Sequence, residues 1–334
     1  MNLRRRACIQ ALLASTLPSV QLAVQAQSKG AEVVNETWRD GARARNIPVK
    51  IRWPAASLSP SERPVVIFSH GLGGTVEGGA IWGEAWAAAG FVVLHLQHPG
   101  SDLDAARAVA TSFADQPALR TQAGAPQLIA RLADVSFALD EIERRHTVKQ
   151  GRWANVRPNQ VGMSGHSFGA RTAMGMAGQR SPGFDDMNEP RLASFVAFST
   201  AVPVMGDAAH AYERVTRPVM SVTGSLDGDV VGTGATPARR KAVFAALPKG
   251  VGKGPKAHLV LKDADHMTFA GQTGSAAEIL PREAGTRGLQ AAHHALIARI
   301  TTDWWLATLT NDAPARLRLQ QPAGLQTGDL WELG

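Results

Sequence analysis

Cysteine is almost absent from this 334-residue chain, which holds only Cys8. Cys8 lies in an N-terminal segment that we expect to be removed, so the mature protein is predicted to have no thiol. Such a protein forms no disulfide, uses no cysteine nucleophile and binds no metal through thiolates. Its stability must therefore come from a hydrophobic core, for which a hydrophobic fraction of 44% is ordinary.

Long hydrophobic runs are also missing, except near the N-terminus. There Arg4 to Arg6 form a basic region, Ala7 to Val24 are mostly apolar, and small residues at Ala26 offer a cleavage site. This order predicts a secretory signal over residues 1–26 and a periplasmic or secreted protein. The alternative is an uncleaved membrane anchor, but Pro18 and Gln21 interrupt the run, which falls short of the roughly 20 apolar residues of a span. The paired arginines leave both Sec and Tat export open.

Charged residues are sparse, at 19% of the chain. Cleavage after Ala26 removes three arginines and no acids, which lowers the net charge from +7 to +4. The remaining arginines are scattered, and few aromatic residues lie among them. This pattern argues against a nucleic acid partner. Because no later segment is long and apolar enough for a span, we also expect no stable membrane insertion after cleavage.

Short apolar runs alternate with segments of helical period along the rest of the chain. This alternation predicts an α/β fold with a mostly parallel central sheet and helices on both faces. Residues 33–38 and 48–53 are predicted to pair antiparallel at the N-terminal edge. We expect one domain over residues 27–334, with the tail after about residue 312 loosely held. The predicted strands are 65–68, 91–94, 161–163, 195–198, 219–222 and 258–261, and the predicted helices include 127–145, 170–177 and 287–309.

The segment Gly165 to Gly169, with the sequence G-H-S-F-G, is the strongest motif in the chain. It follows a predicted strand and precedes a predicted helix, which is the setting of the nucleophile elbow in α/β-hydrolases. Glycines two residues before and after the serine remove side chains that would collide with the strand and the helix. Ser167 is therefore the predicted nucleophile, and the α/β-hydrolase fold is the predicted architecture.

A serine nucleophile needs a base, and the base needs an acid to orient it. In this fold the chain order is serine, acid, histidine. Asp227 follows the predicted strand at 219–222, and His266 follows the one at 258–261, so we predict these two as acid and base. Asp229 remains an alternative acid.

Other titratable residues near these positions are predicted to have supporting roles. Asp263 and Asp265 are expected to shape the loop beside His266. His293 and His294 lie in the last helical pattern, where packed or solvated side chains are the better interpretation.

Backbone N–H groups are expected to stabilise the oxyanion that forms during acyl transfer. Phe168, the residue after the nucleophile, should supply one of them. The glycine-rich loop from Ser69 to Gly74 should supply the other, at Leu72, with His70 tying the loop down through a ring hydrogen bond. A phosphate-binding loop is the alternative, but no Lys-Ser/Thr pair follows these glycines.

Three segments of the chain resemble the platelet-activating-factor acetylhydrolase group and related dienelactone-hydrolase-like proteins. These are Phe68 to Gly73, Gly165 to Gly169, and Asp40 to Val49, which is similar to an edge-strand signature of the bacterial members. The resemblance covers about residues 32–309 and implies a carboxylic-ester hydrolase that needs no cofactor. It also implies oxyanion donors at Leu72 and Phe168.

The chain departs from this resemblance in two ways. The animal acetylhydrolases carry the triad acid after the strand that follows the nucleophile helix, whereas here that strand leads into Ser199 and Thr200. The acid then has to be Asp227, so the phospholipid substrate is not carried over. Dienelactone hydrolases use a cysteine, so Ser167 argues against lactone ring-opening of their kind.

Residues near the motifs are candidates for substrate contacts. Trp82 and Trp86 follow the oxyanion loop, and His98 and Asp102 follow the next strand, so at least some of them are expected to form walls of the site, although core packing is an even alternative for Trp86. His95 is a further candidate at that strand. Residues 100–126 and 233–256 are expected to be loop-rich insertions, too short for a full helical lid. An open, partly apolar cleft that favours acetyl to hexanoyl esters follows from this.

The motifs together predict an exported serine esterase that acts through an acyl-enzyme, on a small-molecule or polymeric ester, without cofactor or metal. An amidase or peptidase, acting on an amide or an acidic polymer, is an alternative that the same triad permits. An acyltransferase is a third possibility. A catalytically inactive binding module is disfavoured, because Ser167, Asp227 and His266 are all present. The sequence leaves the oligomeric state open.

Overall fold

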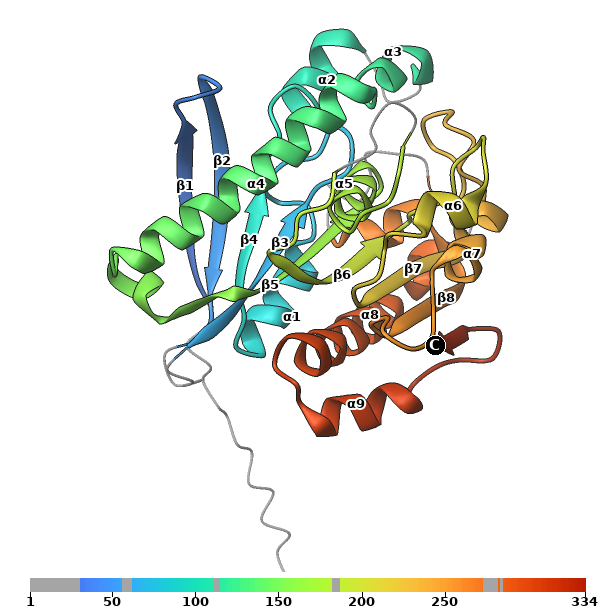
Figure 1. Cartoon of the computed structure of the whole chain (residues 1–334). Helices are drawn as coiled ribbons and strands as arrows, with labels where there is room; N and C mark the ends of the chain where they lie inside the picture. The colour runs from blue at the N-terminus through green and yellow to red at the C-terminus, as the bar shows by residue number, and fades with distance from the viewer. Residues whose placement is uncertain (1–30, 56–61, 111–114, 182–186, 273–281, 283–284) are drawn as a thin grey trace, which may run out of the picture.

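Nine strands join into one sheet in the computed structural model, which describes residues 31–55, 62–110, 115–181, 187–272, 282 and 285–334 (Figure 1). The predicted signal segment, residues 1–26, lies outside the described residues. The strands are β1 Glu32–Asp40, β2 Arg45–Trp53, β3 Arg63–Ser69, β4 Val92–Leu96, β5 Val156–His166, β6 Leu192–Phe198, β7 Val219–Leu226, β8 Lys256–Asp265 and β9 Leu330–Leu333.

The strand order is β1-β2-β4-β3-β5-β6-β7-β8-β9. The six strands from β3 to β8 run parallel to one another. At the N-terminal edge β1 and β2 pair antiparallel, and β2 is antiparallel to β4. This mostly parallel sheet with an antiparallel N-terminal edge confirms the predicted α/β-hydrolase architecture.

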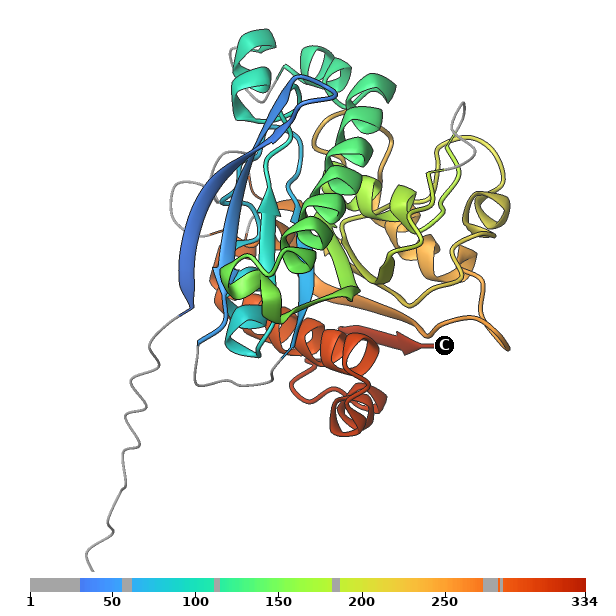
Figure 2. The same cartoon turned by 60° about the vertical axis from the view of Figure 1, so that its left-hand side comes forward.

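Helices cover both faces of the sheet. They are α1 Ala80–Ala88, α2 Leu103–Val109, α3 Gln116–Thr121, α4 Ala125–Thr147, α5 Phe168–Met176, α6 Ala208–Tyr212, α7 Pro237–Ala246, α8 Thr286–Leu309 and α9 Ala313–Gln320, with two 3₁₀ turns, η1 Gly151–Asn155 and η2 His266–Ala270. Buried side chains of α4, α5 and α7 share one hydrophobic cluster with the sheet. Those of α1, α8 and α9 share a second cluster on the opposite face. The long helix α4 crosses in front of the strands in Figures 1 and 2.

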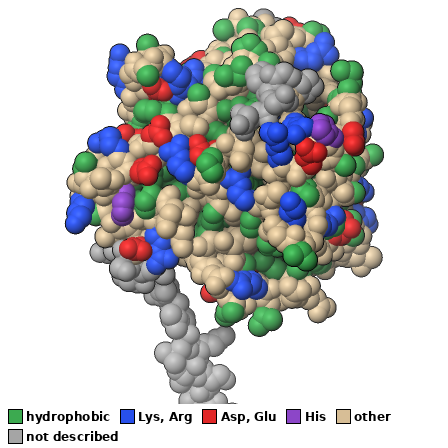
Figure 3. Space-filling model, viewed as in Figure 1, with side chains coloured by type: hydrophobic (Ala, Val, Ile, Leu, Met, Phe, Trp, Pro, Cys, Tyr) green, Lys and Arg blue, Asp and Glu red, His purple; other side chains and the backbone are tan. Residues whose placement is uncertain are grey.

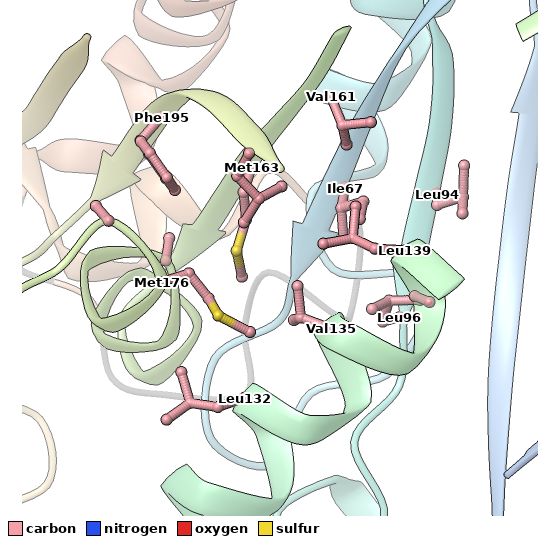
Figure 4. Packing of buried hydrophobic residues seen from close by; sticks show 14 of the residues in the cluster. Ile67, Leu94, Leu96, Leu132, Val135, Leu139, Val161, Met163, Met176 and Phe195 are labelled. Carbon is pink, nitrogen blue, oxygen red and sulfur yellow. The ribbon is translucent and has the colours of Figure 1, made fainter. Parts of the chain in front are cut away.

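Helix α4 shows why the sequence period identifies this layer. Its apolar residues recur every three or four positions, so they form one stripe along the helix. Val135 and Leu139 lie beside Ile67 of β3 and Leu96 of β4, whereas Leu132 points toward the side of α5, as Figure 4 shows. Burying such a side chain is worth about 1.5–3 kcal/mol, so this stripe fixes α4 against the sheet.

The C-terminal tail is ordered, and the expectation that it is loosely held after residue 312 is wrong. Asp312 caps α9 by accepting a hydrogen bond from Ala315 N–H at 2.6 Å, and Leu319 is buried. Strand β9 then pairs antiparallel with β8 at the second edge of the sheet. The side chain of Trp331 in β9 donates from Nε1 to the Leu319 carbonyl at 3.0 Å, which connects β9 to α9.

The two expected insertions contain more helix than predicted. Residues 100–126 include α2, α3 and the start of α4, although residues 111–114 lie outside the described part. Residues 233–256 include α7, whose Val243 is buried in the cluster under the sheet, so α7 belongs to the covering layer. The predicted loop-rich roof is therefore confined to the segments around these helices.

Positive and negative side chains lie among one another on the face seen in Figure 3. Within the described residues, no helix combines the length and the apolar character that crossing a membrane requires.

Candidate active site

The backbone turns sharply at Ser167, between β5 and α5. Ser167 has φ 56° and ψ −114°, a conformation rarely adopted by a residue with a side chain. Its N–H donates to the Phe198 carbonyl at 2.9 Å, which ties the turn to β6. A Cβ on Gly169 would collide with the Ser69 carbonyl and lie 2.8 Å from that of His70. The turn therefore requires glycine at this position, as expected for a nucleophile elbow.

His266 and Asp227 meet at the carboxyl ends of β8 and β7. The Nδ1 atom of His266 lies 2.8 Å from Asp227 Oδ1, and both side chains are buried. Asp227 Oδ2 also accepts from the Thr223 hydroxyl at 2.7 Å. Burial alone would raise the pKa of Asp227, but Arg240 and His266 hold it below its usual value. Asp227 is thus an ionised hydrogen-bond acceptor for the imidazole.

The structure brings Ser167, Asp227 and His266 to one place. Ser167 and His266 line the same two cavities, and Asp227 lies behind His266. Asp229 is directed elsewhere, because its carboxylate accepts from Val231 N–H at 3.2 Å and from Gly234 N–H within its own loop. The geometry therefore favours Asp227 over Asp229 as the partner of His266.

Residues around His266 hold its loop in place. Asp265 caps η2 by accepting from Thr268 N–H at 3.1 Å, and it pairs with Arg282 Nε at 2.6 Å. His166 donates from Nε2 to the His266 carbonyl at 3.0 Å, with ring centroids 4.6 Å apart. Asp265 thus shapes the loop beside His266 as predicted, whereas Asp263 is half-exposed and lies two residues earlier in β8.

Arg240 of α7 is a buried cation beside this pair that the sequence analysis missed. Its Nε lies 3.0 Å from Asp227 Oδ1, and its Nη2 lies 3.3 Å from His266 Nδ1. The same guanidinium donates to the carbonyls of Asp227, Ser199 and Gly228. Arg240 therefore fixes the loop that carries Asp227 and adds positive charge next to the imidazole.

The glycine-rich loop lies against the nucleophile. A Cβ on Gly71 would be 3.5 Å from Ser167 Cβ, and Leu72 lines both cavities together with Ser167. Phe168 is the first residue of α5, so its N–H has no partner within the helix. The structure thus places Leu72 and Phe168 beside Ser167, where the sequence puts the oxyanion donors.

Arg131 of α4 supports this loop from behind. It is fully buried and donates to the His70 carbonyl at 2.7 Å and to the Ser101 hydroxyl at 2.8 Å. Its guanidinium also lies over the Phe168 ring, 4.3 Å from the centroid. Burial lowers the pKa of Arg131 to about 9, so it remains a cation at neutral pH. Arg131 therefore links α4, the glycine-rich loop and the first residue of α5.

A second chain of contacts runs from the edge hairpin to the same loop. Arg45 pairs with Asp134 of α4 at 2.7 Å, and Asp134 accepts from His98 Nδ1 at 2.9 Å. Ser69 donates to His98 Nε2 at 2.9 Å, and His98 N–H donates to His70 Nε2 at 3.0 Å. The ring of His70 thus ties down the loop as predicted, with Nδ1 bonded to the Gly71 carbonyl.

These buried groups have strongly shifted pKa values. Burial lowers the pKa of His98 to about 4, against the opposing effect of Asp134. Burial would raise the pKa of Asp134, but His98 and Arg45 lower it to about 2. Because Asp134 is ionised and His98 neutral near pH 7, the ring has one defined tautomer, with Nδ1 as donor and Nε2 as acceptor.

The sequence gives one indication that Arg131 and Asp134 have special roles, which is that they interrupt an apolar pattern. Both lie on the apolar stripe of α4, where a charged residue is out of place unless it has a buried partner. No such sign marks Arg240, because its helix carries several basic residues.

The prediction that Trp82, Trp86 and His98 form walls of the site is wrong. All three are fully buried and line neither cavity. Trp82 donates to the Phe269 carbonyl at 3.2 Å and so supports η2 from behind. Trp86 donates to the Thr301 hydroxyl at 3.0 Å in the core between α1 and α8. His98 belongs to the loop-support network described above. Asp102 caps α2 and is not at the cavity either.

His95, His293 and His294 also have structural positions. His95 is buried and donates from Nδ1 to the Gly78 carbonyl at 2.8 Å. His293 and His294 are buried in α8, and His294 lies 2.9 Å, at Nε2, from the Thr268 carbonyl. Both are therefore packed helix residues. In the described ranges, no cluster of three or more His, Cys, Asp or Glu side chains is arranged to hold a metal ion.

Ser167 lies where two cavities meet. The main cavity has a volume of about 350 Å³ and the small cavity about 70 Å³. Leu72, Val230, Val231 and His266 line both. Apolar lining residues of the main cavity include Val202, Val204 and Met205 after β6. Its charged and polar lining residues include Arg171, Gln179, Thr200, Asp229 and Arg240. Two cavities that share Ser167 in their lining are suited to the two halves of a substrate.

Residues 43–152 match the family described as platelet-activating factor acetylhydrolase, isoform II. The match confirms the predicted resemblance and supports a hydrolase of the esterase type. It spans β2, the glycine-rich loop and α4, including Arg45, Leu72, Arg131 and Asp134, and it ends before Ser167. No curated protein matches the chain.

Proposed function

We propose that this protein is an exported serine hydrolase that cleaves carboxylic esters, with Ser167 as nucleophile, His266 as general base and Asp227 as the orienting acid. One observation carries the proposal. Ser167 occupies a strained elbow at the cavity that His266 also lines, and His266 Nδ1 lies 2.8 Å from the ionised Asp227. The family match supports the ester class.

The reaction then follows the two steps of serine acyl transfer. Ser167 Oγ attacks the ester carbonyl as His266 accepts its proton, and the oxyanion is held by the N–H groups of Leu72 and Phe168. The tetrahedral adduct collapses, the C–O bond to the alcohol breaks, and the imidazolium gives its proton to the departing alkoxide. Water, deprotonated by His266, then attacks the acyl-enzyme and releases the carboxylic acid and Ser167.

The main cavity supports a preference for small substrates. Its volume of about 350 Å³ is near the lower end for small-molecule sites, roughly 300–1,000 Å³. The described part of 100–126 and 233–256 supplies short helices rather than one long cover, so we expect acetyl to hexanoyl esters to react without activation by a lipid–water interface.

The test is a panel of 4-nitrophenyl esters from acetyl to dodecanoyl, with 4-nitroanilides of the same acids. We expect turnover of the short esters, little turnover of the anilides, and loss of about 10³-fold or more in kcat for both Ser167→Ala and His266→Ala. Circular dichroism should show that both variants fold. Near-normal turnover by either variant would contradict the proposed roles, and faster anilide than ester cleavage would establish an amidase. Acyl transfer to an added alcohol in preference to water would identify an acyltransferase.

The export part of the proposal is tested separately. The sequence of residues 1–26 supports it, and N-terminal sequencing of the protein from the periplasm or medium should begin near Gln27. Recovery of full-length protein in the cytoplasm would contradict export without affecting the proposed chemistry.

A further inference from the structure

Arg171 places a positive charge in the wall of the main cavity, one helical turn from the nucleophile. It follows Ser167 by four residues in α5, and its N–H donates to the Ser167 carbonyl at 3.0 Å. Residues four apart lie on the same side of a helix, separated by about 6 Å along its axis. The side chain is half-buried and lines the main cavity but not the small one.

The guanidinium of Arg171 has few hydrogen-bond partners among the described residues. Within that part of the chain its side chain makes one hydrogen bond, from Nη1 to the Ala123 carbonyl at 3.2 Å, although a guanidinium has five N–H donors. No carboxylate of the described residues forms an ion pair with it. Burial lowers the pKa of Arg171, with no acidic group opposing this effect. A cation in this state favours an anion from outside the protein.

The other charged groups of the main cavity already have partners. Arg240 pairs with Asp227 at 3.0 Å and bonds three carbonyls. Asp229 accepts from Val231 N–H, Thr233 Oγ1 and Gly234 N–H, all in its own loop. Arg171 is therefore the cavity cation that remains available within the described part of the chain.

We propose that Arg171 binds a carboxylate of the substrate, so that the preferred ester is an anion with its carboxylate a few bonds from the scissile bond, such as the monoester of a short dicarboxylic acid. This inference rests on the proposed ester hydrolysis. A planar guanidinium pairs with a carboxylate through two parallel hydrogen bonds, which fixes the direction of the substrate as well as binding it. The apolar wall from Val202 to Met205 would then contact the short spacer.

The test compares charged and neutral esters of one shape. Mono-4-nitrophenyl glutarate carries the carboxylate on the acyl side, and its methyl ester is the neutral match. 4-Acetoxybenzoate carries the carboxylate on the leaving group, and its methyl ester is again the neutral match. We expect kcat/KM to be higher for the acid than for its methyl ester, by about 10-fold or more, in one of the two pairs. That pair shows which half of the substrate occupies the main cavity.

Variants then assign the preference to Arg171. Arg171→Gln should lower kcat/KM for the preferred acid by about 10–100-fold and for its methyl ester far less. Arg171→Lys should lose less activity on the acid than Arg171→Gln, since lysine keeps the charge but cannot form the bidentate hydrogen bonds. Arg316→Gln is the control, because it removes the same charge from exposed α9 and should leave both rates as in the wild type.

Two results would overturn the inference. One is a wild-type enzyme that prefers the methyl ester, or is indifferent, in both pairs. The other is a loss in Arg171→Gln that is equal for acid and methyl ester, which would indicate a structural role. Either result is distinct from failure of the proposed function, which would show as absence of Ser167-dependent turnover on every ester.

Discussion

Arg240 Nε lies 3.0 Å from Asp227 Oδ1, the same oxygen that His266 Nδ1 meets at 2.8 Å. One carboxylate oxygen of Asp227 therefore contacts both a permanent cation and the imidazole. In the proposed reaction His266 gains a proton, and Arg240 then opposes the new charge while Asp227 favours it. His166 is the other titratable group that faces His266, and burial lowers its pKa well below the usual value, so it adds no charge.

This arrangement makes a prediction about the pH profile. Arg240→Gln removes a cation that holds the pKa of Asp227 below its usual value, so Asp227 takes up a proton at higher pH and the acidic limb of kcat/KM should move to higher pH. Lys241→Gln is the control, since Lys241 lies on the same helix but is exposed. A parallel drop at all pH values, with no shift of the limb, would show that Arg240 only holds the loop.

The two candidate acids should differ sharply. Asp227→Asn removes the carboxylate that orients His266 and stabilises its charged form, so we expect kcat to fall by roughly 10³–10⁴-fold. Asp229→Asn should change kcat by less than about 10-fold, because the bonds of Asp229 to described residues are all within its own loop. Steady-state kinetics on 4-nitrophenyl butyrate would measure both. The opposite ranking would move the acid role to Asp229.

Arg131 should affect catalysis by holding the glycine-rich loop in position. Arg131→Met removes the hydrogen bonds to the His70 carbonyl and the Ser101 hydroxyl. The loop then no longer holds in place the N–H of Leu72, the proposed oxyanion donor, and loss of a single such donor costs about 10²–10³-fold in kcat. We expect a fall of about 10–100-fold in kcat with a small change in KM.

The control for Arg131 is Arg145→Met on the same helix. Arg145 is also largely buried, but it pairs with Glu36 and Glu141, far from the loop. Both variants should lower the melting temperature, whereas only Arg131→Met should lower kcat. Equal effects on kcat would mean that Arg131 serves stability alone.

The local parts of the fold and site were predictable because their causes are local. The period of the apolar residues identified α4, and short apolar runs identified the parallel strands. The glycine spacing around Ser167 identified the elbow, because the turn leaves no room for a Cβ at Gly169. The chain order of Asp227 and His266 after successive strands then placed them at one edge of the sheet, where the structure brings them together.

The remaining features depend on contacts between distant segments. Trp82 and Trp86 follow the glycine-rich loop, but which side of α1 faces the sheet is decided by packing against α8. Strand β9 has only four residues and is formed by pairing with β8, so no pattern of its own predicts it. Arg131 holds the glycine-rich loop, about 60 residues away along the chain. Arg240 holds the Asp227 loop, 13 residues away. Neither contact can be seen from the local sequence.

Two glycines offer opposite outcomes for one substitution. Gly169→Ala should prevent folding or abolish activity, because the added Cβ meets the backbone of Ser69 and His70. Gly288→Ala should raise the free energy of unfolding by about 0.5 kcal/mol, since Gly288 is an exposed position of α8 with nothing within 4 Å of an added Cβ. Urea titration and ester turnover measure both, and an active, stable Gly169→Ala protein would contradict the described elbow.

Buried neutral histidines should make the fold sensitive to mild acid. Burial lowers the pKa of His258 to about 4 and that of His95 to about 3. As the pH falls below about 6.5, the unfolded chain takes up protons at these rings while the native protein does not. The free energy of unfolding should therefore fall steadily from about pH 6.5 to pH 4, before most carboxylates are protonated.

His258 offers a direct test, because it is far from the candidate active site. It lies on β8, with Nδ1 2.7 Å from the Ser221 hydroxyl and its ring stacked on Phe244. His258→Gln removes the titrating ring, so the loss of stability between pH 7 and pH 4.5 should shrink by about 2 kcal/mol. Phe244→Leu is the control, since it removes the stacked ring but no titrating group and should lower stability by a similar amount at both pH values. Urea titrations at pH 7 and pH 4.5 decide the outcome, and an unchanged difference in His258→Gln would show that protonation of this ring does not destabilise the native state.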